Sequence, residues 1–173
     1  MTSRRIVLIA VFLWCAAIYA TPLLAAGGGI GASLAGFSYR FFSHICHQLD
    51  SHSFFFHGAK FPVCVRCTSI YTAFFFSLLV FPLLSRWFKQ LCAERFIFSS
   101  RSLFLIAAVP MATDVVSAVA GVHSVTTMTR LLTGAWFGFI MGIVLAPLLE
   151  EALHHALTSF YKNHTGAYHE TKA

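Results

Sequence analysis

Three of the five cysteines in the chain lie in one stretch that also holds several histidines, between residues 44 and 67. Cys64 and Cys67 form a C-x-x-C pair, and Cys46 is the third thiol. Two thiolates at this spacing can chelate one metal ion or close a small, reducible disulfide. Three cysteines and one histidine make a tetrahedral four-ligand set of the kind that holds zinc. The stretch therefore predicts a site for zinc or another thiolate-binding transition metal, with the candidate ligands Cys46, Cys64, Cys67, His44 and His47.

The two candidate histidines flank Cys46. His44 and His47 are three residues apart, which would place them on one face of a helix. Cys46 and His47 are neighbours in the sequence and would point about 100° apart on a helix. Both can therefore bind the same ion only where the helix is broken.

Two other interpretations of the cysteines remain open. In an oxidising compartment free thiols tend to form disulfides, and the cysteines would then be structural staples. Three cysteines cannot all pair within one chain, whereas a metal would use all three. The remaining interpretation is a redox-active pair formed by Cys64 and Cys67. Such a pair needs a thiolate of lowered pKa, and Arg66 lies between the two cysteines, where its charge would stabilise one.

A single acidic residue, Asp114, interrupts a long apolar stretch. An unpaired carboxylate inside a membrane costs about 3 kcal/mol on insertion scales, so Asp114 should face other helices and have a partner. Arg66 and Arg130 both enter the apolar region from the same side and are the candidate partners. We expect these three residues, with Gln48, to form a polar pocket beneath the thiols; the alternative is an ion pair that only fixes the helix register.

The composition indicates a membrane protein. The 173 residues are 58% hydrophobic and only 10% charged, whereas a soluble domain of this length needs more polar surface. The net charge of +6 is carried by residues that lie between apolar runs, which is typical of membrane topology determinants. No basic stripe or base-stacking platform indicates nucleic-acid binding. The expected partner is therefore the lipid bilayer, and no nucleic acid.

Four stretches are long and apolar enough to cross a bilayer, at about residues 6–26, 63–84, 103–122 and 131–149. We predict an all-α integral membrane bundle of four transmembrane helices, with an interfacial Cys/His segment between the first two. One transmembrane domain covers residues 1–162, and a polar cytoplasmic tail covers 163–173. The first stretch also resembles a signal peptide, but its length favours a retained span.

The distribution of basic residues predicts the orientation. Arginines and lysines gather before the first span, between the second and third spans, and in the tail. The positive-inside rule therefore predicts a multi-pass protein of the inner (cytoplasmic) membrane with both termini in the cytoplasm. The Cys/His segment then lies on the outer face.

Three glycines recur at intervals of four in the last span, at Gly134, Gly138 and Gly142. This double G-x-x-x-G pattern produces a flat face for close helix packing. Packing within the bundle is the first expectation, and a homodimer seam is the alternative.

Several short motifs together resemble a known family. They are Cys-His-Gln at 46–48, Pro-Val-Cys-Val-Arg-Cys-Thr at 62–68, Ile-Tyr at 70–71, Pro110, Asp114, Arg130 and Thr-Gly at 133–134. The chain resembles uncharacterised bacterial multi-pass membrane proteins, a domain of unknown function with Cys-His-Gln and Pro-Val-Cys-x-Arg-Cys-Thr-Gly-Ile-Tyr motifs, over roughly residues 44–142. It departs from that pattern at Asp50 and His52, where Pro and Arg are usual, at Ser69, where Gly is usual, and at Thr127, where Asn is usual. The resemblance implies no activity and supports only the architecture and these residues.

A weaker likeness concerns the redox interpretation. The layout also resembles quinone-coupled disulfide-forming oxidoreductases, which are four-helix membrane proteins with a C-x-x-C at the outer mouth of the second span and an arginine nearby. This resemblance implies a membrane quinone as the electron acceptor. Those enzymes need a second cysteine pair in an outer loop, where this chain offers only Cys46.

Overall fold

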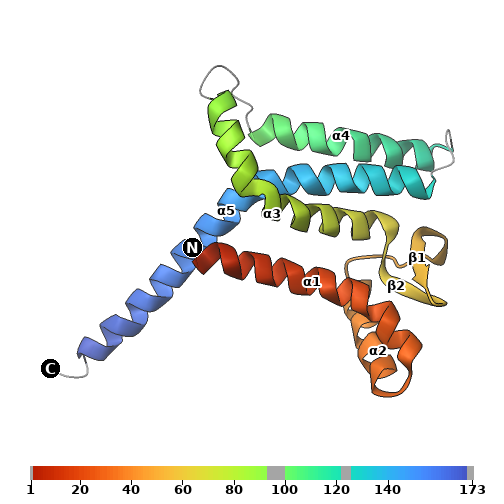
Figure 1. The fold of residues 1–173 in the computed structure, drawn as a ribbon, viewed down its shortest axis with the longest axis horizontal. Coiled ribbons are helices and arrows are strands. Elements are labelled where there is room, and N and C mark those ends of the chain that lie inside the picture. The colour runs from red at the N-terminus through yellow and green to blue at the C-terminus, as the bar shows by residue number, and fades with distance from the viewer. Residues whose placement is uncertain (1, 93–99, 122–125, 171–173) are drawn as a thin grey trace.

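The computed structural model describes residues 2–92, 100–121 and 126–170 (Figure 1). The last residue of the predicted third span, at 122, and the end of the predicted tail, at 171–173, lie outside the described residues. The elements in chain order are α1 (Thr2–Gly27), α2 (Gly29–Ser43), one 3₁₀ turn (Asp50–His52), β1 (Ser53–Phe56), β2 (Ala59–Cys64), α3 (Val65–Cys92), α4 (Ser100–Val119) and α5 (Thr127–Glu170).

Four of these helices are long and apolar enough to span a membrane. The candidate spans are Ser3–Gly27, Val65–Leu83, Ser102–Val119 and Thr127–Ser159. They confirm the predicted all-α class and the four spans. The predicted span boundary at residue 149 falls inside α5, because this helix continues without a break to Glu170 and includes most of the predicted tail.

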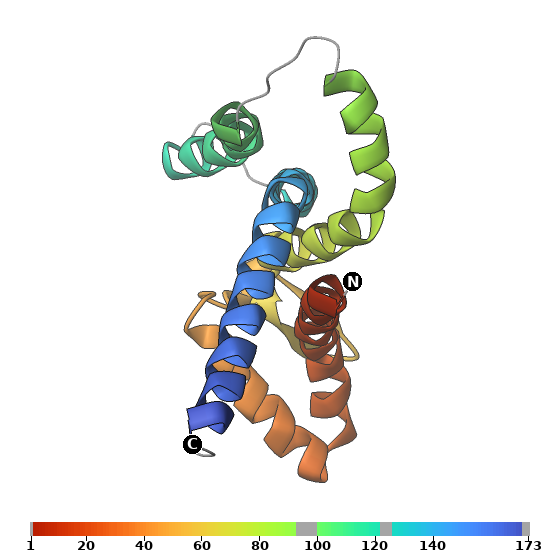
Figure 2. The ribbon, with the colours of Figure 1, turned by 90° about the vertical axis from the view of Figure 1, so that its left-hand side faces the viewer.

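The four long helices lie side by side in the order α4, α5, α3, α1, and Figure 2 shows the same row from one end. We call the end of the row where α3 and α5 begin the thiol end. Both α3 and α5 change direction far from this end. Each contains an internal proline, Pro82 in α3 and Pro147 in α5, which removes a backbone hydrogen bond and kinks a helix.

The contact between α3 and α5 is made by the three glycines at 134, 138 and 142, all of which are buried. A side chain at Gly138 would collide with the backbone of Ile70, whose carbonyl carbon would lie 2.8 Å from the added Cβ. A side chain at Gly142 would collide with the side chain of Ser77. The structure therefore uses this glycine face for packing within the chain, which is the first of the two roles that the pattern allowed.

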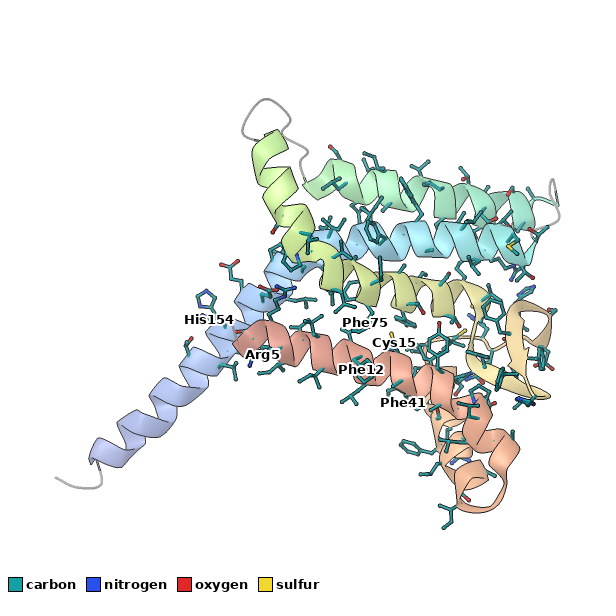
Figure 3. The ribbon with its side chains drawn as sticks, in the orientation of Figure 1. Arg5, Phe12, Cys15, Phe41, Phe75 and His154 are labelled. Atoms are coloured by element: carbon teal, nitrogen blue, oxygen red, sulfur yellow. The ribbon has the colours of Figure 1, made fainter. Side chains whose placement is uncertain are left out.

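Helix α1 packs on the other side of α3 and folds back into α2. The rings of Phe12 and Phe75 lie 5.9 Å apart, and the Cys15 thiol donates to the Tyr71 carbonyl at 3.6 Å (Figure 3). Two glycines with positive φ, Gly28 and Gly29, form the turn between α1 and α2. Helix α2 leaves the direction of the spans (Figure 1), as expected for an interfacial segment.

A small β-hairpin lies at the thiol end, and it was not predicted from the sequence. Strands β1 and β2 are antiparallel, and Phe56 pairs with Ala59 across a two-residue turn. Both turn residues have positive φ, 48° at His57 and 78° at Gly58, as type I′ turns require. A His-Gly pair between aromatic residues was the signal that could have revealed it.

Candidate metal centre

The three thiols come from two segments of the chain. Cys64 is the last residue of β2, and Cys67 lies in the first turn of α3, which begins at Val65. Cys46 follows the end of α2, where its N–H still donates to the carbonyl of Phe42 at 3.0 Å. Helix α2 ends at Ser43, so the helix break that joint binding by the neighbours Cys46 and His47 required is present.

The sulfur atoms of Cys46, Cys64 and Cys67 all lie within 4.8 Å of one another. The Cys64 N–H also donates to Cys46 Sγ at 3.2 Å. Cys46 is buried, and the other two are half-buried. All three are free thiols. The structure therefore brings together the three cysteines that the sequence singled out.

The two candidate histidines lie outside this group. His44 is exposed, and its Nδ1 donates to the carbonyl of Arg40 at 2.9 Å. His47 is exposed as well. Over the described ranges, no histidine, aspartate or glutamate joins the three sulfurs in one group. Within these ranges the candidate ligand group therefore consists of three sulfur atoms.

The local environment favours a thiolate at Cys46. Hydrogen bonds from the Cys64 and Cys67 side chains lower the pKa of the Cys46 thiol far below its ordinary value, and backbone N–H groups act in the same direction. Burial opposes this effect because it disfavours the charged form. The stabilisation of the thiolate thus comes from within the cluster.

Apolar side chains enclose the thiols on the side of α1 and α2. Cys46 belongs to a buried cluster with Ile18, Phe42 and Val63, and Cys67 and Tyr71 pack against it. This wall keeps water away from one side of the sulfurs. Electrostatic interactions are stronger at such a low-dielectric position than in water.

Gln48 has a positioning role. Its side-chain amide donates to the carbonyl of Tyr39 at 2.7 Å and to that of Pro62 at 2.8 Å. The residue has a positive φ of 50°. The amide joins the loop that carries Cys46 to the strand that carries Cys64. Gln48 therefore holds the thiols together rather than lining a pocket with the charged residues.

Of the two candidate partners of Asp114, the structure pairs it with Arg66. The two side chains form a buried ion pair between α3 and α4. Arg66 projects from α3 toward α4 and α5, while Cys67 packs toward α1 and α2. The pair therefore does not lie beneath the thiols. The guanidinium of Arg66 is bonded to a carboxylate, so it does not have the thiolate-stabilising position that the redox interpretation gave it.

Arg130 has a different partner. Its Nη2 donates to Nε2 of His52 at 2.9 Å, which requires a neutral imidazole with its proton on Nδ1. Burial, and then the charges of Arg130 and Arg66, lower the pKa of His52. In the sequence His52 stands out only as a departure from the family pattern, and no sequence signal predicts its contact with Arg130. An arginine at this position would repel Arg130.

The fold and the site together define a class, namely a multi-pass helical membrane protein with a cluster of three cysteines at one end of its spans. The chain belongs to the family described as "Predicted membrane protein (DUF2085)", whose model matches residues 46–144. The match begins at Cys46 and includes all three clustered cysteines, Asp114 and Arg130.

Two curated relatives are archaeal and uncharacterised. A protein of Methanocaldococcus jannaschii is 29% identical over 116 residues, which cover 67% of this chain and 70% of the relative. A protein of Methanothermobacter thermautotrophicus is 29% identical over 114 residues, which cover 65% of this chain and 95% of the relative. No solved structure matches the chain significantly.

Proposed function

We propose that the protein holds one thiolate-binding metal ion, with zinc the first candidate, through Cys46, Cys64 and Cys67. The observation that carries this proposal is the approach of the three sulfurs to within 4.8 Å of one another. Zinc–sulfur bonds of about 2.3 Å in a tetrahedral site bring sulfurs to roughly 3.8 Å, so only small side-chain shifts are needed. The thiolate favoured at Cys46 supplies part of the required charge.

The fourth coordination position distinguishes two kinds of site. Structural zinc sites have four protein ligands, whereas catalytic sites keep one position for water or substrate. His44 and His47 are the protein candidates because they adjoin Cys46 in the chain. Both are exposed and would have to turn toward the sulfurs. An open position is the arrangement that needs least rearrangement.

We place the site on the outer face of the inner membrane, with both chain termini in the cytoplasm. This orientation rests on the distribution of basic residues and on the positive-inside rule. The three thiols are then exposed to an oxidising compartment, where a bound metal would protect them from disulfide formation.

Elemental analysis of the purified full-length protein tests the metal proposal. We expect about one metal ion per chain, which a Cys64→Ser variant loses because a three-sulfur site cannot spare a ligand. The matched control is Cys15→Ser, since the Cys15 thiol contacts the Tyr71 carbonyl and lies outside the cluster. A Cys15→Ser protein should keep its metal. Metal-free wild-type protein whose thiols all titrate would contradict the proposal.

Histidine variants decide the fourth ligand. If His44 or His47 completes the site, the corresponding alanine variant should bind the metal about 10-fold or more weakly in a chelator competition. If neither variant changes the affinity, the fourth position is open. Both results are compatible with three-cysteine binding and differ only in the kind of site.

A second candidate function is thiol–disulfide exchange, because the same proximity of sulfurs also suits disulfide formation. Oxidation of Cys64 and Cys67 would release two protons and two electrons, with a membrane quinone as the acceptor. Thiol trapping in cells, with and without a membrane-permeant reductant, tests it. A fixed redox state of Cys64 and Cys67, with no mixed disulfide through Cys46, would exclude this activity.

A further inference from the structure

A groove of about 620 Å³ runs along the contact between α3 and α5, and none of the three clustered cysteines lines it. Tyr19 of α1 and Phe54 of β1 also line it. Along α5 its lining extends from Leu131 to Phe139, about 12 Å at the helical rise per residue. Because these residues belong to membrane spans, the groove opens toward lipid rather than water.

The polar groups of the groove already have partners. Thr72 Oγ1 lies 2.9 Å from the Tyr19 hydroxyl and donates to the Thr68 carbonyl at 2.7 Å. Ser69 Oγ donates to the Arg66 carbonyl at 2.8 Å. Thr68 Oγ1 lies 3.1 Å from the Cys64 carbonyl and donates to it. The groove therefore suits a hydrocarbon chain, which forms no hydrogen bonds.

A positive charge lies at the thiol end of this groove. Arg130 directly precedes the lining residue Leu131, and its guanidinium contacts the neutral ring of His52. Asp114 is paired with Arg66, and Asp50 with Lys60. Among the residues that the structure describes, no carboxylate pairs with Arg130.

The position of Arg130 at a helix N-terminus adds to this uncompensated positive charge. It lies in the first turn of α5, which begins at Thr127. Helix N-termini carry a partial positive charge and favour anions, so an arginine there is unfavourable unless an anion compensates it. The charge of Arg130, next to the Leu131 end of the groove, and the apolar lining match the two halves of an anionic lipid.

We propose that Arg130 and this groove bind one anionic phospholipid from the leaflet at the thiol end. The phosphate group contacts the Arg130 guanidinium, and one acyl chain lies in the groove between α3 and α5. This site uses none of the three cysteines, so the lipid proposal can be tested independently of the metal proposal.

Trp136 provides the probe because it lines the groove. Trp14→Phe and Trp87→Phe substitutions leave it as the only one of the three tryptophans in the full-length chain. This protein is placed in phosphatidylcholine bilayers that contain a small fraction of lipid with brominated acyl chains, which quench nearby tryptophan. Brominated phosphatidylglycerol should quench at roughly fivefold lower mole fraction than brominated phosphatidylcholine, the effect expected of one arginine.

Two substitutions that each remove one positive charge distinguish binding at this site from a general electrostatic attraction to anionic lipid. Arg130→Gln should abolish the preference for the anionic lipid. Arg40→Gln removes an exposed arginine at the end of α2 and should leave the preference intact. Arg130→Lys should also retain most of it, and this variant serves if Arg130→Gln does not fold. Equal quenching by the two lipids, or a preference that survives Arg130→Gln, overturns the proposal.

The groove itself is tested by filling it. Ala135→Phe should reduce quenching by both brominated lipids, because the acyl chain loses its space. If inorganic phosphate abolishes the preference while Ala135→Phe changes nothing, the site binds free phosphate and the lipid proposal is wrong. If an unbrominated neutral quinone displaces the brominated chain better than phosphatidylglycerol does, the occupant is not an anionic lipid.

Discussion

The ion pair between Arg66 and Asp114 lies inside the helix packing. The Asp114 side chain is 7% exposed and that of Arg66 is 19% exposed. Taking two charges out of water is costly, and removing one partner leaves the other charge buried without compensation. The pair therefore fixes the rotation of α3 relative to α4, whether or not it adds net stability.

We predict that Asp114→Asn destabilises the protein by about 3 kcal/mol, because it leaves the Arg66 charge unpaired. Thermal or denaturant unfolding in detergent measures this. The control is Asp50→Asn, which breaks the ion pair with Lys60 at a carboxylate that is 77% exposed. That change should cost less than about 1 kcal/mol.

A double variant tests whether the unpaired charge causes the loss of stability. Adding Arg66→Gln to Asp114→Asn should cost less than the sum of the two single changes, since no unpaired charge remains. Strict additivity would show that the two side chains act independently.

The sequence predicted part of this residue-scale arrangement. Asp114 needed a partner because it lies within an apolar span, and both candidate arginines were identified. The choice between them depends on helix rotation, which hydropathy does not determine. The same limit applies to the histidines: His44 and His47 would share a face only on a helix, α2 ends before both of them, and their role as ligands stays a prediction.

At the scale of elements, the contact between α3 and α5 depends on backbone proximity. Glycine normally destabilises a helix by about 1 kcal/mol relative to alanine. At position 138 glycine is favoured over alanine, because the backbone of Ile70 occupies the space that a side chain would need. Lipid chains are as apolar as the helices, so such close van der Waals packing is the main force that joins them.

Gly138→Ala should therefore destabilise the protein by about 1–3 kcal/mol, the usual cost of overpacking. Unfolding in detergent measures it. Gly36→Ala in α2 is the matched control, because nothing lies within 4 Å of the added methyl group. This control should be neutral or stabilising by up to about 1 kcal/mol. Equal effects of the two changes would exclude a specific role for the glycine face.

The elements differed in how well the sequence predicted them. The four spans were predicted because crossing a bilayer requires about 20 apolar residues, a constraint that leaves a clear pattern. The β-hairpin was missed because its strands are short and β1 contains three consecutive phenylalanines, which resemble the neighbouring apolar helices. Only its turn residues, His57 and Gly58, carried a distinct signal.

For the whole molecule, the arrangement of helices separates two ends. Arg4 of α1 forms an ion pair with Glu150 of α5 at 3.6 Å, so the start of the chain lies beside the far part of α5. The hairpin lies at the opposite end (Figure 1), and its second strand ends at Cys64. Four spans return the chain to the side on which it began.

Reporter fusions test the orientation that we propose. A phosphatase inserted at the hairpin turn, at Gly58, should be active because that enzyme folds only outside the cytoplasm. A fluorescent protein at the C-terminus should be bright because it matures inside. The reverse pattern would place the cysteines in a reducing compartment and would remove the argument that a metal protects them.

One feature of the site joins these scales. Cys64 ends β2 and Val65 begins α3, so no loop residue separates the strand from the helix. A ligand that draws the three sulfurs together therefore pulls on α3 directly, without slack to absorb the movement. Since α3 lies between α1 and α5, gain or loss of that ligand would shift α3 relative to both neighbouring helices.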